Sequence, residues 1–258
     1  MNTLRKVLIG GNWKSNGDTQ FAKNFVPQVL NNLKFNKNRC EVVVSPTSIH
    51  MSLVKSLITN EGVHVSSQNV SQYPAGAYTG EITPQMLKDM DFHWTLTGHS
   101  ERRQYFGETS EIVAIKTKNA LDSGLNVIAC IGENLTEREE NRTVDVCISQ
   151  LSPIMKTLND LKAWRNVVIA YEPVWAIGTG KTATPEQAQE VHMHLRNWLR
   201  QNLSETVANE TRIIYGGSVS EKNAKDLIVQ NDIDGFLVGG ASLKPAFTDI
   251  VQSSELKI

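Results

Sequence analysis

Residues 167–182 read VVIAYEPVWAIGTGKT, an apolar run that ends in a single carboxylate, Glu172. Such a continuous run is typical of a strand buried on both faces, as in parallel sheets. After the carboxylate come a proline, an apolar patch and two glycines that allow a hinge. This order predicts a base covered by a moving lid, and we expect the cover to exclude water and raise the pKa of Glu172. The predicted lid comprises Pro173, Val174, Trp175, Ala176, Ile177, Gly178, Thr179, Gly180 and Lys181.

Three other interpretations of this stretch are open. A phosphate-binding P-loop needs a glycine five positions before Gly180, where Trp175 stands instead. A dinucleotide fingerprint needs an acidic residue at the end of a second strand about 20 residues later, and none is found there. A purely structural turn remains, although such turns seldom expose a Trp and three aliphatic residues.

Similar apolar runs recur along the chain, with longer helical patterns between them. The runs lie at 6–11, 42–45, 63–66, 93–97, 126–131, 167–171, 212–216 and 235–239. The helical patterns include 18–33, 84–90, 109–123, 184–203 and 220–230, which begin with Asp, Thr or Ser caps or with an early proline. Eight alternating units predict an α/β fold, a (β/α)8 TIM barrel in which residues 1–258 form one domain. A doubly wound open sheet is the alternative.

The composition excludes several classes of protein. The net charge is −1, which favours neither nucleic acid nor an acidic membrane surface as a partner. Three cysteines without metal spacing, and no signal peptide, predict reduced thiols in the cytoplasm. No cluster of metal ligands is evident, and we expect no metal and no cofactor.

In a barrel, the residues that follow the strands meet at one mouth. They include Asn12 and Lys14, His99 and Glu101, and Glu172. Glycine pairs follow strands seven and eight, where barrels often bind phosphate through backbone N–H groups. Lys14 could equally be a solvated surface lysine and His99 a core histidine, and Glu101 is best interpreted as an ion-pair partner of Lys14 or Arg102. A shielded base, an imidazole and a cation together favour proton transfer next to a carbonyl.

Six motifs, in order along the whole chain, resemble the triosephosphate isomerase family. They are NWK at 12–14, GHSERR at 98–103, CIGE at 130–133, YEPVWAIGTGK at 171–181, YGGS at 215–218 and VGGASL at 238–243. The resemblance implies interconversion of dihydroxyacetone phosphate and D-glyceraldehyde 3-phosphate without a cofactor. It implies that Glu172 is the base, that neutral His99 polarises the carbonyl, and that Lys14 and Asn12 bind and stabilise the oxygens. Phosphate would be held at Gly178, Ser218, Gly239 and Gly240.

The resemblance also implies a homodimer. Residues 71–81 form a long loop with an apolar tip at Tyr78. In the family this loop inserts into a pocket formed by residues 12–16 of the partner subunit, which brings the residue matching Thr79 near the partner's active site. Two positions depart from the family pattern. Ser15 replaces a larger side chain in the interface, and Thr97 replaces an aliphatic residue, so its hydroxyl needs a partner.

Two rival functions were weighed against isomerisation. A non-catalytic phosphate-binding protein would not need Glu172, His99 and Lys14 all intact. Another phosphate-sugar barrel isomerase would not carry the six motifs in this order.

Overall fold

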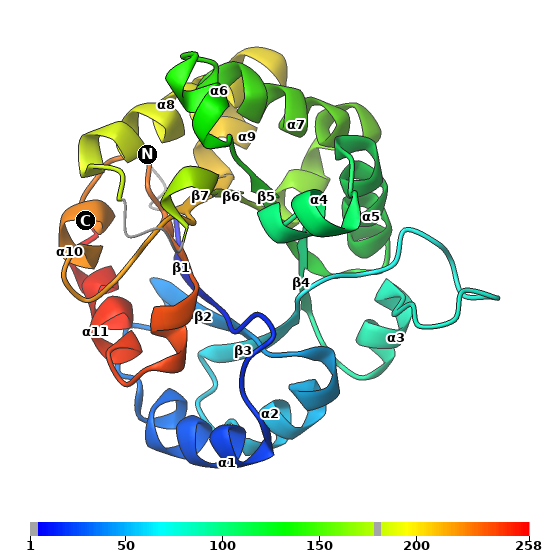
Figure 1. Cartoon of the computed structure of the whole chain (residues 1–258), viewed down its shortest axis with the longest axis vertical. Coiled ribbons are helices and arrows are strands. Elements are labelled where there is room, and N and C mark those ends of the chain that lie inside the picture. Colours follow the sequence, from blue (N-terminus) through cyan, green and yellow to red (C-terminus); the bar gives the residue numbers. More distant parts are fainter. Residues whose placement is uncertain (1–4, 178–181, 258) are drawn as a thin grey trace.

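The computed structural model describes residues 5–177 and 182–257, and its eight parallel strands close into a barrel. Each strand pairs with its neighbours in chain order, and the first strand also pairs with the last. Figure 1 looks down the barrel and shows the strands in the centre with the helices around them. The strands are β1 Val7–Asn12, β2 Cys40–Ser45, β3 Val63–Ser67, β4 Trp94–Thr97, β5 Asn126–Ile131, β6 Val167–Tyr171, β7 Arg212–Tyr215 and β8 Gly235–Val238. The predicted (β/α)8 fold is confirmed.

Helices connect the strands on the outside of the barrel. The α-helices are α1 Thr19–Gln28, α2 Met51–Leu57, α3 Pro84–Asp89, α4 Ser100–Phe106, α5 Ser110–Asp122, α6 Leu135–Glu139, α7 Thr143–Thr157, α8 Pro185–Asn202, α9 Glu205–Glu210, α10 Ala224–Ile228 and α11 Phe247–Gln252. Short 3-10 turns are η1 Leu30–Asn32, η2 Ser48–His50, η3 Leu161–Asn166, η4 Val174–Ala176, η5 Gly240–Leu243 and η6 Ser253–Leu256.

Local sequence explains where several helices begin. Asp18 accepts a hydrogen bond from the Phe21 N–H at the start of α1, and Thr109 does the same for α5. Thr184 and Gln187 form a capping box before α8. The helix expected over 220–230 is wrong in extent, because Asn223 accepts the Ser220 N–H in a turn and regular helix begins only at Ala224.

Two apolar layers fill the fold. Side chains that alternate along the strands fill the barrel itself, and this inner set contains only strand residues. A larger set packs the outer faces of the strands against the helices. The strands are therefore buried on both faces, which explains their continuous apolar sequences. This packed interior leaves the chemistry to the residues beyond the strand ends.

Candidate active site

The predicted base and imidazole lie together at the carboxyl end of the barrel. His99 follows β4 and Glu172 follows β6, and the His99 Nε2 lies 3.0 Å from the Glu172 Oε1. Both side chains are buried, with Glu172 only 2% exposed. The second carboxylate oxygen of Glu172 accepts the backbone N–H of Ser100 at 3.0 Å. His99 is therefore a buried histidine at the mouth of the barrel with a partner on each ring nitrogen.

The pKa of Glu172 is lowered, contrary to the sequence-based expectation. Burial acts to raise the pKa, but the charge and hydrogen bond of His99, the Ser100 N–H and the charge of Lys14 together outweigh burial. The prediction failed because the shielding was inferred from local sequence, whereas the compensating groups come from other strands.

The proton of the His99 ring is placed by its two neighbours. The N–H of Glu101, at the start of α4, donates to His99 Nδ1 at 3.2 Å, so that nitrogen must offer a lone pair. The ring proton then lies on Nε2, which faces Glu172. Burial alone lowers the pKa of His99, but attraction to the carboxylates of Glu172 and Glu101 outweighs burial and raises it.

Lys14 is fixed by its backbone as well as by its charge. Its φ of +54° lies in the left-handed region, which is unusual for a lysine. The side chain of Asn12 accepts the Lys14 N–H at 3.0 Å, and the amide of Gln68 donates to the Lys14 carbonyl at 2.8 Å. Lys14 Nζ pairs with Glu101 Oε1 at 2.6 Å, which confirms the ion-pair role predicted for Glu101. Lys14 is therefore a partly exposed lysine held in an ion pair.

The glycine turn after β8 leaves open backbone near Lys14, whereas the turn after β7 does not. A Cβ added at Gly239 would lie 3.7 Å from the Lys14 side chain, and one at Gly240 would meet no heavy atom within 4 Å. Gly240 also begins the short turn η5. After β7, Gly217 has no space for a side chain, since a Cβ there would lie 2.2 Å from the Tyr215 hydroxyl oxygen. The Ser218 carbonyl accepts from Asn223 at 2.9 Å.

The described part of the predicted lid is anchored by a residue to which sequence reasoning gave no role, Glu133. One oxygen of this buried carboxylate accepts from Trp175 Nε1 at 2.9 Å and from the Tyr171 hydroxyl at 3.1 Å. Burial raises the pKa of Glu133, although these donors oppose the effect. Its place just after β5 was the available signal. Gly178, Thr179, Gly180 and Lys181 lie outside the described residues.

Two buried side chains near the site are explained by their surroundings. The hydroxyl of Thr97 lies 3.0 Å from that of Thr117 on α5. Thr117 is therefore the hydrogen-bond partner that a buried hydroxyl at position 97 needs. The Cys130 thiol is fully buried, and burial, followed by the nearby Glu172 charge, raises its pKa well above the usual range. A thiol in this state is a poor nucleophile, as expected from the sequence.

Of the residues predicted for a subunit interface, Ser15 lies beside the site, and Tyr78 and Thr79 lie on a projecting segment. Ser15, Lys14, His99 and Glu101 contribute to the lining of one cavity of about 370 Å³. Tyr78 and the exposed Thr79 lie on the segment between β3 and α3, which extends away from the barrel in Figure 1. The rings of Tyr73 and Tyr78 stack at 4.4 Å there.

A buried carboxylate facing an imidazole, with a cation and glycine turns around the same mouth, defines a barrel enzyme of the proton-transfer class. The sequence model described as triosephosphate isomerase matches residues 7–254. The triosephosphate isomerase of Neurospora crassa is 51% identical over 250 residues, covering 97% of this chain and 99% of its own. That of Taenia solium is 48% identical over 249 residues (96% and 98%), and the cytosolic triosephosphate isomerase of Oryza sativa is 50% identical over 254 residues (98% of each).

The chain belongs to the triosephosphate isomerase family. It is an aldose–ketose isomerase that interconverts dihydroxyacetone phosphate and D-glyceraldehyde 3-phosphate by proton transfer through an enediolate.

Proposed function

We propose that Glu172 is the base that carries the proton between the two carbons of the triose phosphate. The observation that supports this most directly is the 3.0 Å contact between two buried groups, Glu172 Oε1 and His99 Nε2, at the mouth of the barrel. In this role the carboxylate removes a proton from the carbon next to the carbonyl and returns it to the neighbouring carbon. His99, with its proton on Nε2, donates to the oxygens as charge develops on them.

Substrate binding would also adjust the base. The contact with His99 is the strongest of the effects that lower the pKa of Glu172. A substrate oxygen that takes over the His99 Nε2–H would weaken this effect and so raise the pKa of Glu172. The carboxylate would then become more basic only when substrate is present. This family is a well-known example in which the surroundings tune the pKa of a glutamate base.

Lys14 and Asn12 complete the proposed binding site. Lys14 supplies positive charge to the substrate, while Asn12 holds the backbone of Lys14 and lies at the same mouth. Phosphate would be bound by backbone N–H groups at Gly178, Ser218, Gly239 and Gly240. The open space at Gly239 and Gly240, close to the Lys14 side chain, supports this assignment.

The lid over residues 173–181 is part of the proposal. The Glu133 carboxylate accepts a hydrogen bond from the Trp175 indole. The Glu133 carbonyl oxygen accepts the Val174 N–H at 3.0 Å. Closure would exclude water and protect the enediolate from losing phosphate. Hydrogen exchange measured across 173–182 should slow when a phosphate-bearing substrate analogue saturates the enzyme. Exchange that ignores the analogue would contradict the lid.

We also propose that the enzyme is a homodimer. The projecting segment 71–81 exposes Tyr73 and Tyr78 at 43% and 41%, and α4 exposes Tyr105 and Phe106. The cavity beside Ser15 extends to Phe106, so the same chain carries both a protruding apolar tip and a recess. Such self-complementarity is what a two-fold interface requires. Docking of the partner would hold the loop of residues 12–16, and with it Asn12 and Lys14, in place.

The remaining proposals concern the location of the enzyme in the cell and its partners. We assign the enzyme to the cytoplasm, as the rice relative is named cytosolic. We expect no nucleic acid and no membrane among its partners, because its net charge is −1. Among residues 5–177 and 182–257, no helix combines the length and apolar character needed to cross a membrane.

The proton-transfer mechanism can be tested in heavy water. Purified enzyme converting D-glyceraldehyde 3-phosphate in D₂O should give dihydroxyacetone phosphate with deuterium bound to carbon, because the base exchanges its proton with solvent. Product without carbon-bound deuterium, together with normal turnover by Glu172→Gln, would contradict Glu172 as the base. Within the same assay, His99→Ala should lower kcat more than it raises KM, whereas Lys14→Ala should impair both.

The dimer can be tested separately. Deletion of residues 75–80 should give a less stable and poorly active monomer, since the Lys14 loop loses its support. Sedimentation equilibrium of the intact chain at micromolar concentration should show the dimer. A fully active monomer under these conditions would refute the proposal.

A further inference from the structure

The side chain of Gln150 contacts both polar backbone groups of one residue, Gly132. The Gly132 N–H donates to Gln150 Oε1 at 2.8 Å, and Gln150 Nε2 donates to the Gly132 carbonyl at 2.9 Å. Gln150 lies on α7, which packs outside β5 (Figure 1), and Gly132 is the first residue after that strand. A primary amide accepts and donates at once, so this side chain can take the place of a peptide group on a neighbouring strand.

On its other side, the segment around Gly132 carries the proposed base. The Ile131 carbonyl accepts the Glu172 N–H at 2.7 Å. The Glu133 carbonyl accepts the Val174 N–H at 3.0 Å. Because bonding direction alternates along a parallel strand, Gly132 directs its own N–H and carbonyl away from β6. A Cβ added at Gly132 would lie 1.7 Å from the Glu172 carbonyl oxygen, so the two backbones are in contact and a shift of one moves the other.

Gln150 is needed on the side of Gly132 that faces β4, because β4 ends before β5 does. The pairing of β4 with β5 extends as far as Thr97 and Ala129. The chain then turns at Gly98, whose φ of +68° favours glycine, and leaves the edge of β5. Backbone N–H and carbonyl groups that are shielded from water need partners. The Gln150 amide supplies both partners to Gly132 where β4 no longer runs beside it.

Packing alone does not fix this segment. A cavity of about 430 Å³ borders Gly132 and is also lined by Glu172, Val174 and Gln150. A residue that has no side chain and lies next to open space is held mainly by its backbone hydrogen bonds. On the β7 side, in contrast, a Cβ added at Gly216 would lie 2.8 Å from Glu172 Cγ, so the base is closely packed there. The two Gln150 bonds therefore fix the side on which the Glu172 backbone has room to move.

We propose that Gln150 is a positioning residue for the isomerisation, an inference that rests on the proposed role of Glu172 as the base. The Gln150 amide fixes Gly132, and Gly132 fixes the Glu172 backbone, so that the carboxylate reaches the carbon that loses its proton. Gln150 acts through the backbone and takes no part in the proton transfer itself. A displaced base slows proton transfer more than it weakens substrate binding, because other residues hold the phosphate.

Gln150→Met tests the proposal, because methionine keeps the length of the side chain but makes neither hydrogen bond. We expect kcat to fall about ten-fold and KM to change less than about two-fold, since a small misplacement of a catalytic group can cost this much. The isotope effect on kcat, measured with substrate deuterated at the carbon that loses its proton, should rise as proton transfer becomes the slowest step. A kcat and an isotope effect equal to those of the wild type would overturn the proposal.

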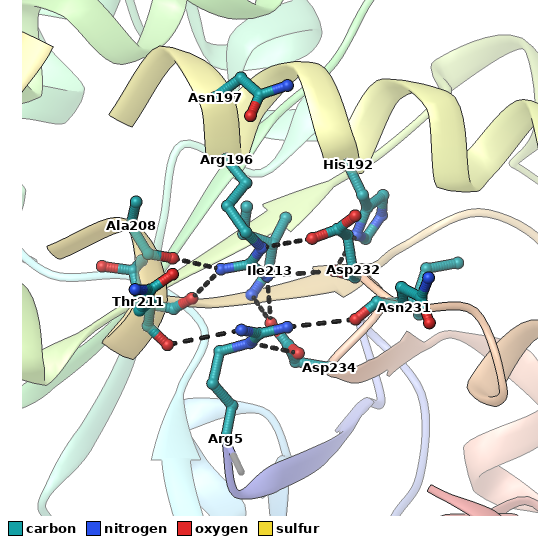
Figure 2. A network of polar contacts seen from close by, with 12 residues as sticks. Arg5, His192, Arg196, Asn197, Ala208, Thr211, Ile213, Asn231, Asp232 and Asp234 are labelled. Carbon is teal, nitrogen blue, oxygen red and sulfur yellow. Dashed lines mark hydrogen bonds and ion pairs between the residues drawn. The ribbon is translucent and has the colours of Figure 1, made fainter. Parts of the chain in front are cut away.

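The matched control is Gln189→Met on α8, which also removes an amide with two bonds. Gln189 Nε2 donates to the Asp232 carboxylate at 2.6 Å, and its Oε1 accepts the Asp232 N–H at 2.9 Å. Asp232 precedes β8 at the amino end of the barrel and belongs to the network drawn in Figure 2. This variant should lose stability as Gln150→Met does but keep the wild-type kcat and isotope effect. Equal losses of kcat in the two variants would assign the effect to destabilisation and overturn the positioning role.

A double-mutant cycle separates the failure of this proposal from the failure of the base assignment. If Gln150 acts through Glu172, then Gln150→Met added to Glu172→Gln lowers kcat no further. The same fold loss on both backgrounds would overturn the positioning role while Glu172 remains the base. Wild-type turnover of Glu172→Gln would refute the base, and the positioning role with it.

A second variant decides the question if Gln150→Met does not fold. Gln150→Asn keeps a polar amide on α7, but its side chain is one methylene too short to hold both Gly132 groups. It should lower kcat and raise the isotope effect in the same direction as Gln150→Met, with KM little changed. Wild-type kinetics for Gln150→Asn would then overturn the proposal.

Discussion

The two ends of the barrel hold their buried charges in different ways. At the amino end, the Arg196 guanidinium contacts Asp232 and Asp234, each at 2.6 Å, and donates to the carbonyls of Ala208 and Thr211 (Figure 2). Arg5 adds a second guanidinium on Asp234. At the carboxyl end, Glu172 faces His99 and one backbone N–H.

This difference separates stability from chemistry. The carboxylates at the amino end have their partners supplied by the protein, so removing one partner leaves charge buried and unpaired. The groups at the mouth contact partners that a substrate can replace. Changes at the mouth should therefore reduce rate with little effect on folding, and changes at the amino end should do the opposite.

The largest effect is expected for Glu172→Gln. Glutamine keeps the shape of the side chain and can still accept the Ser100 N–H, but it cannot act as a base. We expect kcat to fall about 10² to 10⁴-fold, with little change in the thermal midpoint. Coupled assays and thermal unfolding measure the two quantities. Near-normal turnover would refute the assignment of the base.

The converse change is Arg196→Met at the amino end. It removes the guanidinium shared by Asp232 and Asp234, so that Asp232 keeps only Gln189 and Asp234 only Arg5 as side-chain partners among the described residues. We expect a loss of about 3 kcal/mol in the free energy of unfolding. The folded fraction should retain its kcat. Arg165→Met, which breaks an exposed pair with Glu210, is the matched control and should cost less than about 1 kcal/mol. Similar losses for the two variants, measured by denaturant unfolding, would remove the distinction between buried and exposed pairs.

A pH effect should arise from His192, which belongs to the same network. Its Nδ1–H donates to the Asp232 carbonyl at 3.1 Å, and burial lowers its pKa from 6.5 to about 4. The unfolded chain therefore binds a proton below pH 6.5 that the folded chain refuses until about pH 4. As the pH is lowered from 6.5 to about 4, the free energy of unfolding should therefore fall by up to about 3 kcal/mol. His192→Gln should flatten this dependence and exposed His194→Gln should not; equal curves for all three proteins would contradict the prediction.

The smallest effect is expected at Thr97, the last residue of β4, two positions before His99. Thr97→Val leaves the buried Thr117 hydroxyl without its 3.0 Å partner, which should cost about 1 kcal/mol of stability. Valine at both positions removes the unpaired group and should recover part of that loss. A double-mutant cycle measured by chemical denaturation gives the coupling energy. No coupling between the two positions would show that the hydroxyls do not depend on each other.

The parts of this protein that could be predicted are those encoded locally. Continuous apolar runs identified the strands, and Asp18, Thr109 and Thr184 marked helix starts. The strand-end rule then placed Glu172 and His99 at one mouth. The roles of Glu133 and Thr117 were not predicted, because Trp175 and Thr97, their partners, lie on other elements and the contacts form only when these pack. For the same reason the pKa of Glu172 was predicted in the wrong direction.

The seam between β1 and β8 brings both ends of the described chain to one carbonyl. Arg5 Nη2 donates to the Asn231 carbonyl at 3.1 Å, and Lys257 Nζ approaches the same oxygen at 3.3 Å. A short linker should therefore join the two ends without strain. A circularly permuted chain that begins at another of the eight units should then form the same barrel. The barrel is in this sense a circular object that the gene has opened between its eighth strand and its first.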